Sequence, residues 1–208
     1  TPLDQIVEIV DNAHVVFRSG KTRPISWRRK QIEGLIKLVE NESEELIKVL
    51  KEDLSQLRFL AELGPINRII ESARKALKNL SKWTSISKRS LPLTVFPASG
   101  YTIHEPFGVA VIFGVWNFPL ITVLCPLVGA LAAGNCVILK PSEIADASAS
   151  FLVKMIPKYL DSDAIQVVHG GIPQATQLLA QKVDKIFYTG NGHVGRIVMK
   201  AAAKHLTP

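Results

Sequence analysis

The stretch that decides the fold is FGVAVIFGVWNFPLITVLCPLVGALAAGNCVILKPSE, which covers residues 107–143. Its first part, 107–115, is an apolar run of the kind that forms a strand buried on both faces of a parallel sheet. The run stops at Trp-Asn-Phe-Pro, residues 116–119, where polar and turn-forming residues replace the aliphatic ones. The first strand of the predicted sheet therefore ends in side chains that are able to carry chemistry.

A helix and a second strand complete this unit. Small and aliphatic residues over about 119–133 predict the helix, and Gly134 ends it. A second apolar run, 136–140, then leads into Lys-Pro-Ser-Glu at 140–143. Polar groups thus follow two strands at their carboxyl ends, and in a doubly wound α/β sheet that edge is where ligands bind.

The remainder of the C-terminal half continues this alternation of strands and helices. The predicted strands cover 107–115, 136–140, 165–169 and 185–189, and the predicted helices cover 119–133, 143–159, 173–182 and 194–204. Elements at this spacing indicate a parallel sheet with right-handed crossovers. We therefore expect an α/β, Rossmann-like parallel sheet with flanking helices over residues 106–208.

The N-terminal residues 1–83 have a helical pattern instead. Apolar side chains at helical spacing predict helices over about 2–18, 25–40, 42–54 and 65–83. Gly64-Pro65 is a candidate break before the last of these helices.

A change of pattern at residues 91–105 predicts a β-hairpin. Two β-rich pieces, 94–96 and 101–104, flank the turn-forming residues 97–100. The expected organisation is therefore a helical N-terminal part, a hairpin and the βα units.

The composition is that of a globular protein with a modest basic excess. The 208 residues are 47% hydrophobic and 21% charged, and 25 basic against 18 acidic residues give a net charge of +7. Such an excess favours anionic partners, nucleotides among them. The basic cluster of Arg23, Arg28, Arg29 and Lys30 lacks the interleaved aromatic residues of a nucleic-acid platform. We interpret it as a solvated helix face and expect no nucleic-acid partner.

The two cysteines, Cys125 and Cys136, lie in apolar stretches without metal-ligand spacing. Thiols buried among apolar neighbours are usually unreactive, so neither is a candidate nucleophile. The five histidines are scattered along the chain, and we predict no metal site. Free thiols and an N-terminus without a secretory signal pattern favour a cytoplasmic location.

Three segments together carry a family resemblance. They are W-N-F-P at 116–119, K-P-S-E at 140–143 and Y-T-G-N at 188–191. In this order and at these separations they resemble the aldehyde dehydrogenase family, in particular its class 3, fatty-aldehyde type, over nearly the whole chain. The resemblance implies NAD(P)-dependent oxidation of medium- to long-chain or aromatic aldehydes to carboxylic acids. It also implies that the hairpin at 91–105 belongs to an oligomerisation element of a homodimer.

Asn117 has two interpretations. It stands between a strand and a helix with Pro119 in the first turn, as a helix N-cap residue would. Its amide is also suited to donate a hydrogen bond to a developing oxyanion. The resemblance favours the second interpretation, because the Asn of the W-N-[FY]-P segment lies in the oxyanion hole that holds the thiohemiacetal oxygen. The resemblance also makes the neighbouring Trp116 a cofactor-contacting residue.

Lys140 and Glu143 also have two interpretations. Glu143 suits the first turn of a helix that begins after Pro141. A cation and a carboxylate on one short turn are equally suited to bind the hydroxyls of a ribose. The resemblance implies that Lys140 and Glu143 bind the adenosine ribose of the dinucleotide. The carboxylate would repel a 2′-phosphate, which favours NAD and leaves NADP as the alternative.

The glycine-rich segment 189–195 follows a strand and opens a helix, as a pyrophosphate-binding turn does. Its literal match to G-x-G-x-x-G falls on the fourth βα turn of the predicted sheet, which weakens the usual dinucleotide fingerprint. The resemblance implies instead a T-G-[SN]-x-x-[VA]-G segment under the pyrophosphate and nicotinamide. The matching residues are Thr189, Gly190, Asn191 and Gly195, with Gly192 as a chance match.

A last glycine, Gly170, follows the third predicted strand. The resemblance implies that it lies near the adenine side of the cofactor. A plain turn at Gly170-Gly171 explains the same residues, and the sequence leaves both readings open.

The nucleophilic Cys and the general-base Glu that the family requires match no residue of this chain. We therefore expect the chain to supply the cofactor site and the oxyanion Asn, and to be inactive alone, as a fragment or truncated form. The alternative is a non-catalytic dinucleotide-binding or dimerisation module. An acyl-phosphate reductase of the same broad fold is a further alternative, against which W-N-F-P argues. Membrane contact in the fatty-aldehyde type uses a C-terminal tail outside these residues.

Overall fold

A computed structural model describes residues 1–208 and contains the predicted parallel sheet. The sheet has the order β5-β4-β3-β6, and all its neighbouring strands are parallel. Its strands are β3 (Val109–Phe113), β4 (Cys136–Lys140), β5 (Ile165–Val167) and β6 (Lys185–Tyr188). Every residue of β3 and β4 is buried, which explains why their sequences are continuously apolar rather than alternating.

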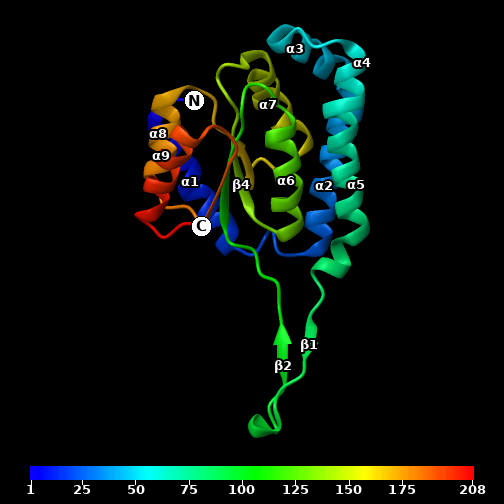
Figure 1. Ribbon diagram of the computed structural model, residues 1–208, viewed down its shortest axis with the longest axis vertical. Helices are drawn as coiled ribbons and strands as arrows, with labels where there is room; N and C mark the ends of the chain where they lie inside the picture. The colour runs from blue at the N-terminus through cyan, green and yellow to red at the C-terminus, as the bar shows by residue number, and fades with distance from the viewer.

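Helices cover both faces of this sheet, as Figure 1 shows. One face carries α1 (Leu3–Arg18), α8 (Ile172–Ala180) and α9 (Gly192–Ala203). The opposite face carries α6 (Ile121–Ala133) and α7 (Asp146–Tyr159), with α2 (Ile25–Asn41) and α5 (Asn67–Trp83) as an outer layer. The helix α3 (Ser43–Leu54) packs against α7. The Rossmann-like α/β class predicted from the sequence is confirmed.

The order in which strands are added to the sheet reverses between β3 and β6. From β3 it proceeds outward through β4 to β5, and it then crosses back to place β6 on the other side of β3. Right-handed crossovers put α6 and α7 on one face and α8 on the other. The carboxyl ends of β3 and β6 are therefore neighbours at the point where the strand order reverses.

The Gly64-Pro65 pair does not start a new helix before α5. A short helix, α4 (Arg58–Ala61), passes through a π-helical turn, η1 (Glu62–Ile66), directly into α5. Pro65 has no amide hydrogen to donate, and the wider turn accommodates it without ending the helix. At the predicted break at Gly64-Pro65, the helix therefore continues with a wider turn instead of ending.

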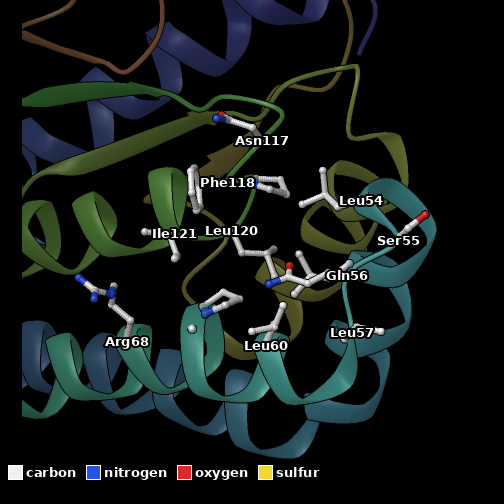
Figure 2. Close-up of a pocket in the computed structure, with 14 residues that line it drawn as sticks. Leu54, Ser55, Gln56, Leu57, Leu60, Arg68, Asn117, Phe118, Leu120 and Ile121 are labelled. Carbon is white, nitrogen blue, oxygen red and sulfur yellow. The ribbon is translucent and has the colours of Figure 1, made fainter.

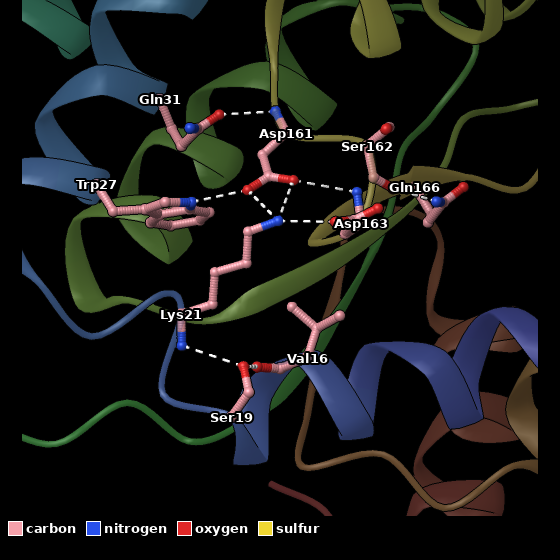
Figure 3. Close-up of polar contacts among 9 residues, drawn as sticks. All are labelled: Val16, Ser19, Lys21, Trp27, Gln31, Asp161, Ser162, Asp163 and Gln166. Atoms are coloured by element: carbon pink, nitrogen blue, oxygen red, sulfur yellow. Dashed lines mark hydrogen bonds and ion pairs between the residues drawn. The ribbon is translucent and has the colours of Figure 1, made fainter.

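The N-terminal helices are tied to the βα units through a polar cluster, shown in Figure 3. The ammonium of Lys21 lies 2.9 Å from Asp161 and 2.8 Å from Asp163. The indole of Trp27 donates to Asp161 at 2.9 Å, and the Gln31 side-chain oxygen accepts from the Asp161 amide at 2.8 Å. One hydrophobic core runs from α1 to β6, so the helical N-terminus and the sheet pack as one body.

A two-stranded arm projects away from this body (Figure 1). Its strands are β1 (Ser87–Arg89) and β2 (Gly100–Thr102), which pair antiparallel. The predicted strand at 94–96 is wrong, because Leu93–Val95 forms a 3₁₀ turn at the tip of the arm. Pro92 and Pro97 flank that turn, and neither is able to donate to a β-ladder. The partner strand therefore lies before Pro92.

Candidate dinucleotide site

A cavity of about 590 Å³ lies at the carboxyl end of the sheet, where β3 and β6 are neighbours. This is the topological switch point at which open α/β sheets bind their ligands. Seven of the residues predicted as site residues line the cavity, namely Trp116, Asn117, Lys140, Glu143, Thr189, Gly190 and Asn191. Gly170 and Gly195 do not line it, whereas Gly171 does. The fold thus brings together segments that are up to 75 residues apart in the chain.

Lys140 and Glu143 form the polar end of this cavity. The side chain of Lys140 is only 3% exposed, and its ammonium donates to the Pro141 carbonyl at 2.8 Å. It lies 3.5 Å from a carboxylate oxygen of Glu143, which is itself half-exposed. Burial lowers the pKa of Lys140, and the nearby Glu143 opposes this shift. A cation and a carboxylate side by side in a cavity wall are able to hydrogen-bond two neighbouring hydroxyls.

The start of α7, which follows this turn, is capped from a distant helix. Both carboxylate oxygens of Asp53, at the end of α3, accept hydrogen bonds from the amides of Ala147 and Ser148, at 3.0 and 2.8 Å. This is the anion that a helix N-terminus favours. The sequence did not single out Asp53, because its partners lie far along the chain and no local motif links them.

The glycines of the 189–195 segment make room for Tyr188. A Cβ at Gly190 would lie 2.1 Å from the Tyr188 hydroxyl, and one at Gly195 would contact its ring at 3.4 Å. The Tyr188 hydroxyl donates to the Asn191 carbonyl at 3.2 Å. Gly195 therefore packs beneath the tyrosine ring rather than facing the cavity.

Gly192 and Asn191 separate the two interpretations of this segment. A Cβ at Gly192 would meet only the terminal nitrogen of the long Arg196 side chain, at 3.4 Å, so the space does not demand glycine there. The side-chain oxygen of Asn191 accepts from the Val194 amide at 3.0 Å and caps α9. The G-x-G-x-x-G match is thus not a set of three sterically required glycines, in keeping with a chance match at Gly192.

Gly170 forms a turn rather than a wall of the cavity. Its φ of +144° is one that residues with side chains rarely adopt, and a Cβ there would collide with Gln174. The next residue, Gly171, lies beside Glu143, which its added Cβ would contact at 3.8 Å. Of the two glycines, the structure places Gly171 at the cavity.

Asn117 has no capping role in the structure. The residue before α6 is Leu120, and no side chain caps this helix. The hydroxyl of Thr122 instead donates to the Phe118 carbonyl at 2.8 Å and accepts from the Val115 amide at 3.1 Å. These bonds hold the turn, while the exposed side chain of Asn117 has no hydrogen-bond partner within residues 1–208 and lines the cavity. The N-cap interpretation is therefore wrong.

Gly114, which no sequence motif marks, permits this turn to pack. A Cβ at Gly114 would lie 2.4 Å from a methyl carbon of Val123 on α6. The signal that could have identified it is a lone glycine at the carboxyl end of a continuously apolar strand.

A second cavity, of about 740 Å³, adjoins the first and is shown in Figure 2. It lies between the α3–α4–η1 segment and the start of α6. Most of its wall is aliphatic or aromatic. Asn117 and Phe118 line both cavities, so the two cavities meet at these residues.

The cysteines lie outside both cavities. Cys136 is fully buried in β4, and burial raises the pKa of its thiol to about 12. Burial also raises the pKa of Cys125 on α6, although the charge of Arg68 acts in the opposite direction. Neither thiol is therefore activated as a nucleophile. No group of three or more His, Cys, Asp or Glu side chains could hold a metal ion.

Comparison with known proteins identifies the family. The sequence model described as "Aldehyde dehydrogenase family" matches residues 3–208. The chain belongs to the aldehyde dehydrogenase family. Members of this family generally use NAD or NADP.

Relatives and solved structures agree with this assignment. An aldehyde dehydrogenase of Craterostigma plantagineum is 41% identical over 96% of this chain and 42% of its own length. Mouse aldehyde dehydrogenase family 3 member A2 is 42% identical over 92% of this chain and 40% of its own length. A Staphylococcus aureus AldH structure, described as a substrate-bound state, has a TM-score of 0.95 at 32% identity and covers 98% of this chain.

These matches cover nearly all of this chain but only part of each relative. The chain spans less than half the length of the curated relatives that it matches, and 44% of the S. aureus chain. A dog relative that is 39% identical is named "Aldehyde dehydrogenase, dimeric NADP-preferring". The family 3 resemblance predicted from the three motifs is confirmed by these relatives.

Proposed function

We propose that this chain forms the cofactor-binding part of an enzyme that oxidises aldehydes to carboxylic acids with NAD or NADP. The observation that carries the proposal is the junction of the two cavities at Asn117. One cavity contains the predicted dinucleotide-binding residues, and the other is largely apolar. An aldehyde carbonyl held at their junction would lie between a cofactor and a site for its own hydrocarbon chain.

The residues present fit a dinucleotide. Lys140 is almost fully buried, and two of its three ammonium protons are directed to Pro141 and Glu143. The third proton and the Glu143 carboxylate are suited to a ribose of the adenosine half. The amides at the start of α9 that Asn191 does not cap, together with the Thr189–Asn191 turn, are suited to the pyrophosphate and nicotinamide. We assign Trp116 to the same cofactor wall, and Gly170 and Gly195 to holding the turns behind it.

In this reaction, the bound nicotinamide supplies a hydride acceptor. The side-chain amide of Asn117 would donate a hydrogen bond to the oxygen that becomes negatively charged when a thiolate adds to the aldehyde carbon. The thiolate and the base that activates water would come from residues outside 1–208. Because neither Cys125 nor Cys136 lines a cavity, we expect this chain alone to bind cofactor without turning over aldehyde.

The apolar second cavity supports medium- to long-chain or aromatic aldehydes as the substrate class. None of the helices combines the length and hydrophobicity that a membrane crossing requires. The cytoplasmic location and the homodimer of the full-length protein stay predictions, and one relative is named as chloroplastic.

Isothermal titration calorimetry with NAD and with NADP tests the cofactor site. We expect NAD binding to weaken by about tenfold or more in Lys140→Ala and in Glu143→Ala, since each loses a charge-assisted hydrogen bond. Glu143→Ala should weaken the binding of NADP less than the binding of NAD, because the substitution also removes a charge that repels the 2′-phosphate. Lys158→Ala and Glu33→Ala, which remove exposed charges elsewhere, should leave both affinities unchanged.

A folded chain that binds neither nucleotide would contradict the proposed site. A chain that binds NAD with unchanged affinity in both cavity variants would show that the dinucleotide lies elsewhere. Circular dichroism of each variant separates these outcomes from loss of folding.

A further inference from the structure

The apolar second cavity contains one charged side chain, Arg68. Its lining residues are Leu50, Leu54, Ser55, Gln56, Leu57, Leu60, Gly64, Pro65, Arg68, Asn117, Phe118, Pro119, Leu120 and Ile121. Figure 2 shows Asn117 and Arg68 well separated along this wall, with Ile121 between them. A molecule that placed a polar group at Asn117 and extended an apolar chain along the cavity would thus meet a cation.

The π-helical turn η1 places Arg68 there. Gly64 lies in η1 and Arg68 in the first turn of α5, and both residues line the cavity. A Cβ added at Gly64 would meet no atom within 4 Å. The glycine therefore leaves open the space that the Arg68 side chain borders.

Arg68 has no acidic partner within residues 1–208. Arg58, two helical turns and a π-bulge earlier, forms ion pairs with Glu44 and with Glu62, the latter at 2.8 Å. None of the ion pairs formed within residues 1–208 includes Arg68, and this exposed residue lines the cavity. Its charge also opposes the burial-induced rise in the pKa of Cys125, which places the guanidinium within electrostatic reach of α6. This guanidinium is free to pair with an anion from a ligand.

We propose that Arg68 selects aldehydes that carry an anionic group at the far end of an apolar chain, such as ω-carboxylated aldehydes. The inference rests on the proposed aldehyde oxidation and names the substrate class of that site. Arg68 acts as a specificity residue: it contacts the end of the substrate that does not react. Guanidinium groups suit this role because they bind carboxylates in a bidentate manner.

The test compares stable substrate analogues that differ only at the far end. Hexanamide, octanamide and decanamide, in which the amide stands for the aldehyde, are titrated into the chain beside their ω-carboxylate counterparts. We expect the carboxylate of the best-fitting length to bind about threefold to fivefold more tightly than its neutral partner, the range for a partly exposed ion pair. This preference should fall as salt is raised.

Three variants make the test specific. Arg68→Gln should abolish the preference for carboxylates and leave the affinity for the neutral amides unchanged. Arg58→Gln, which removes a cation outside the cavity, should retain the preference for carboxylates. Gly64→Leu, which fills the cavity, should weaken both ligand series. An equal preference in the wild-type chain and in Arg68→Gln would overturn the proposal.

Failure of this inference is distinguishable from failure of the proposed function. Neutral amides that bind without any carboxylate preference would overturn the role of Arg68 alone and leave the aldehyde cavity in place. A folded chain that binds NAD but neither amide series would overturn both the Arg68 role and the assignment of this cavity to the aldehyde chain.

Discussion

At the scale of single residues, packing explains which parts of the site the sequence predicted. Lys140 ends β4, and Glu143 and Asn117 lie within four residues of the ends of β4 and β3, so their position at the carboxyl edge was predictable from the chain alone. Asp53 was not, because its role depends on α3 reaching α7 through the tertiary fold. The distinction between Gly190 and Gly192 likewise depends on where the Tyr188 ring lies.

The two glycines give a matched pair of substitutions. Gly190→Ala should destabilise the fold by about 1–3 kcal/mol, because its Cβ would displace the Tyr188 side chain. Gly192→Ala should be neutral or should stabilise the fold by about 0.4–1 kcal/mol, since it lies in the first turn of α9, where its Cβ would meet only the end of the Arg196 side chain, at 3.4 Å. Urea denaturation measures both free energies of unfolding. Equal and large losses in the two variants would support G-x-G-x-x-G as the functional motif and contradict our assignment.

At the scale of elements, hydrophobic pattern predicted the buried strands well and the arm poorly. The strands β3 and β4 are buried on both faces, so their sequences show long apolar runs. The arm strands β1 and β2 are three residues each and mostly solvated, so hydrophobicity does not mark them. Proline positions identified the turn of the arm but not the register of its strands.

The polar cluster that joins the α1–α2 connection to the α7–β5 connection predicts a pH dependence. Partial burial raises the pKa of Asp161, but hydrogen bonds from Lys21 and Trp27 outweigh it and leave that pKa below its ordinary 3.8. Because the folded-state pKa is depressed, this stabilisation is present above about pH 3.8 and is lost as the pH falls through the lower value. The two carboxylates raise the pKa of Lys21 above 10.5, so its contribution is present below that pH and is lost above it.

Substitution of Lys21 by Met isolates this effect. Urea denaturation between pH 3 and pH 11 should show the variant less stable than the wild-type chain near neutral pH. The difference should shrink at both extremes, in acid as Asp161 is protonated and in base as Lys21 loses its proton. A stability difference that stays constant across the whole pH range would argue against an ionic role for the cluster.

At the scale of the whole molecule, the arm is the part that lacks packing partners. It projects from the body, and Leu93 and Phe96 at its tip are 90% and 81% exposed. Exposed apolar side chains on a projecting element are typical of an oligomerisation surface. The overall α/β architecture was predictable from the alternation of elements, whereas the reach of the arm was not.

Two charged substitutions at the tip test the predicted dimer. Leu93→Asp with Phe96→Asp should weaken self-association by at least tenfold, because both side chains would lose apolar contact with a partner copy. Sedimentation velocity over a concentration series measures the strength of self-association. Lys88→Ala, on the same arm and exposed, is the control. Unchanged association in the double variant would remove the arm from the interface.

The central claim is that the carboxyl edge of the sheet binds a dinucleotide next to Asn117. Backbone amide chemical shifts of the ¹⁵N-labelled chain, followed while NAD is added, test it most directly. We predict the largest changes at Lys140–Glu143 and Thr189–Asn191, with smaller changes at Trp116 and Asn117. Saturable binding whose shifts are confined to other surfaces, such as the groove between α3 and α7, would contradict the account.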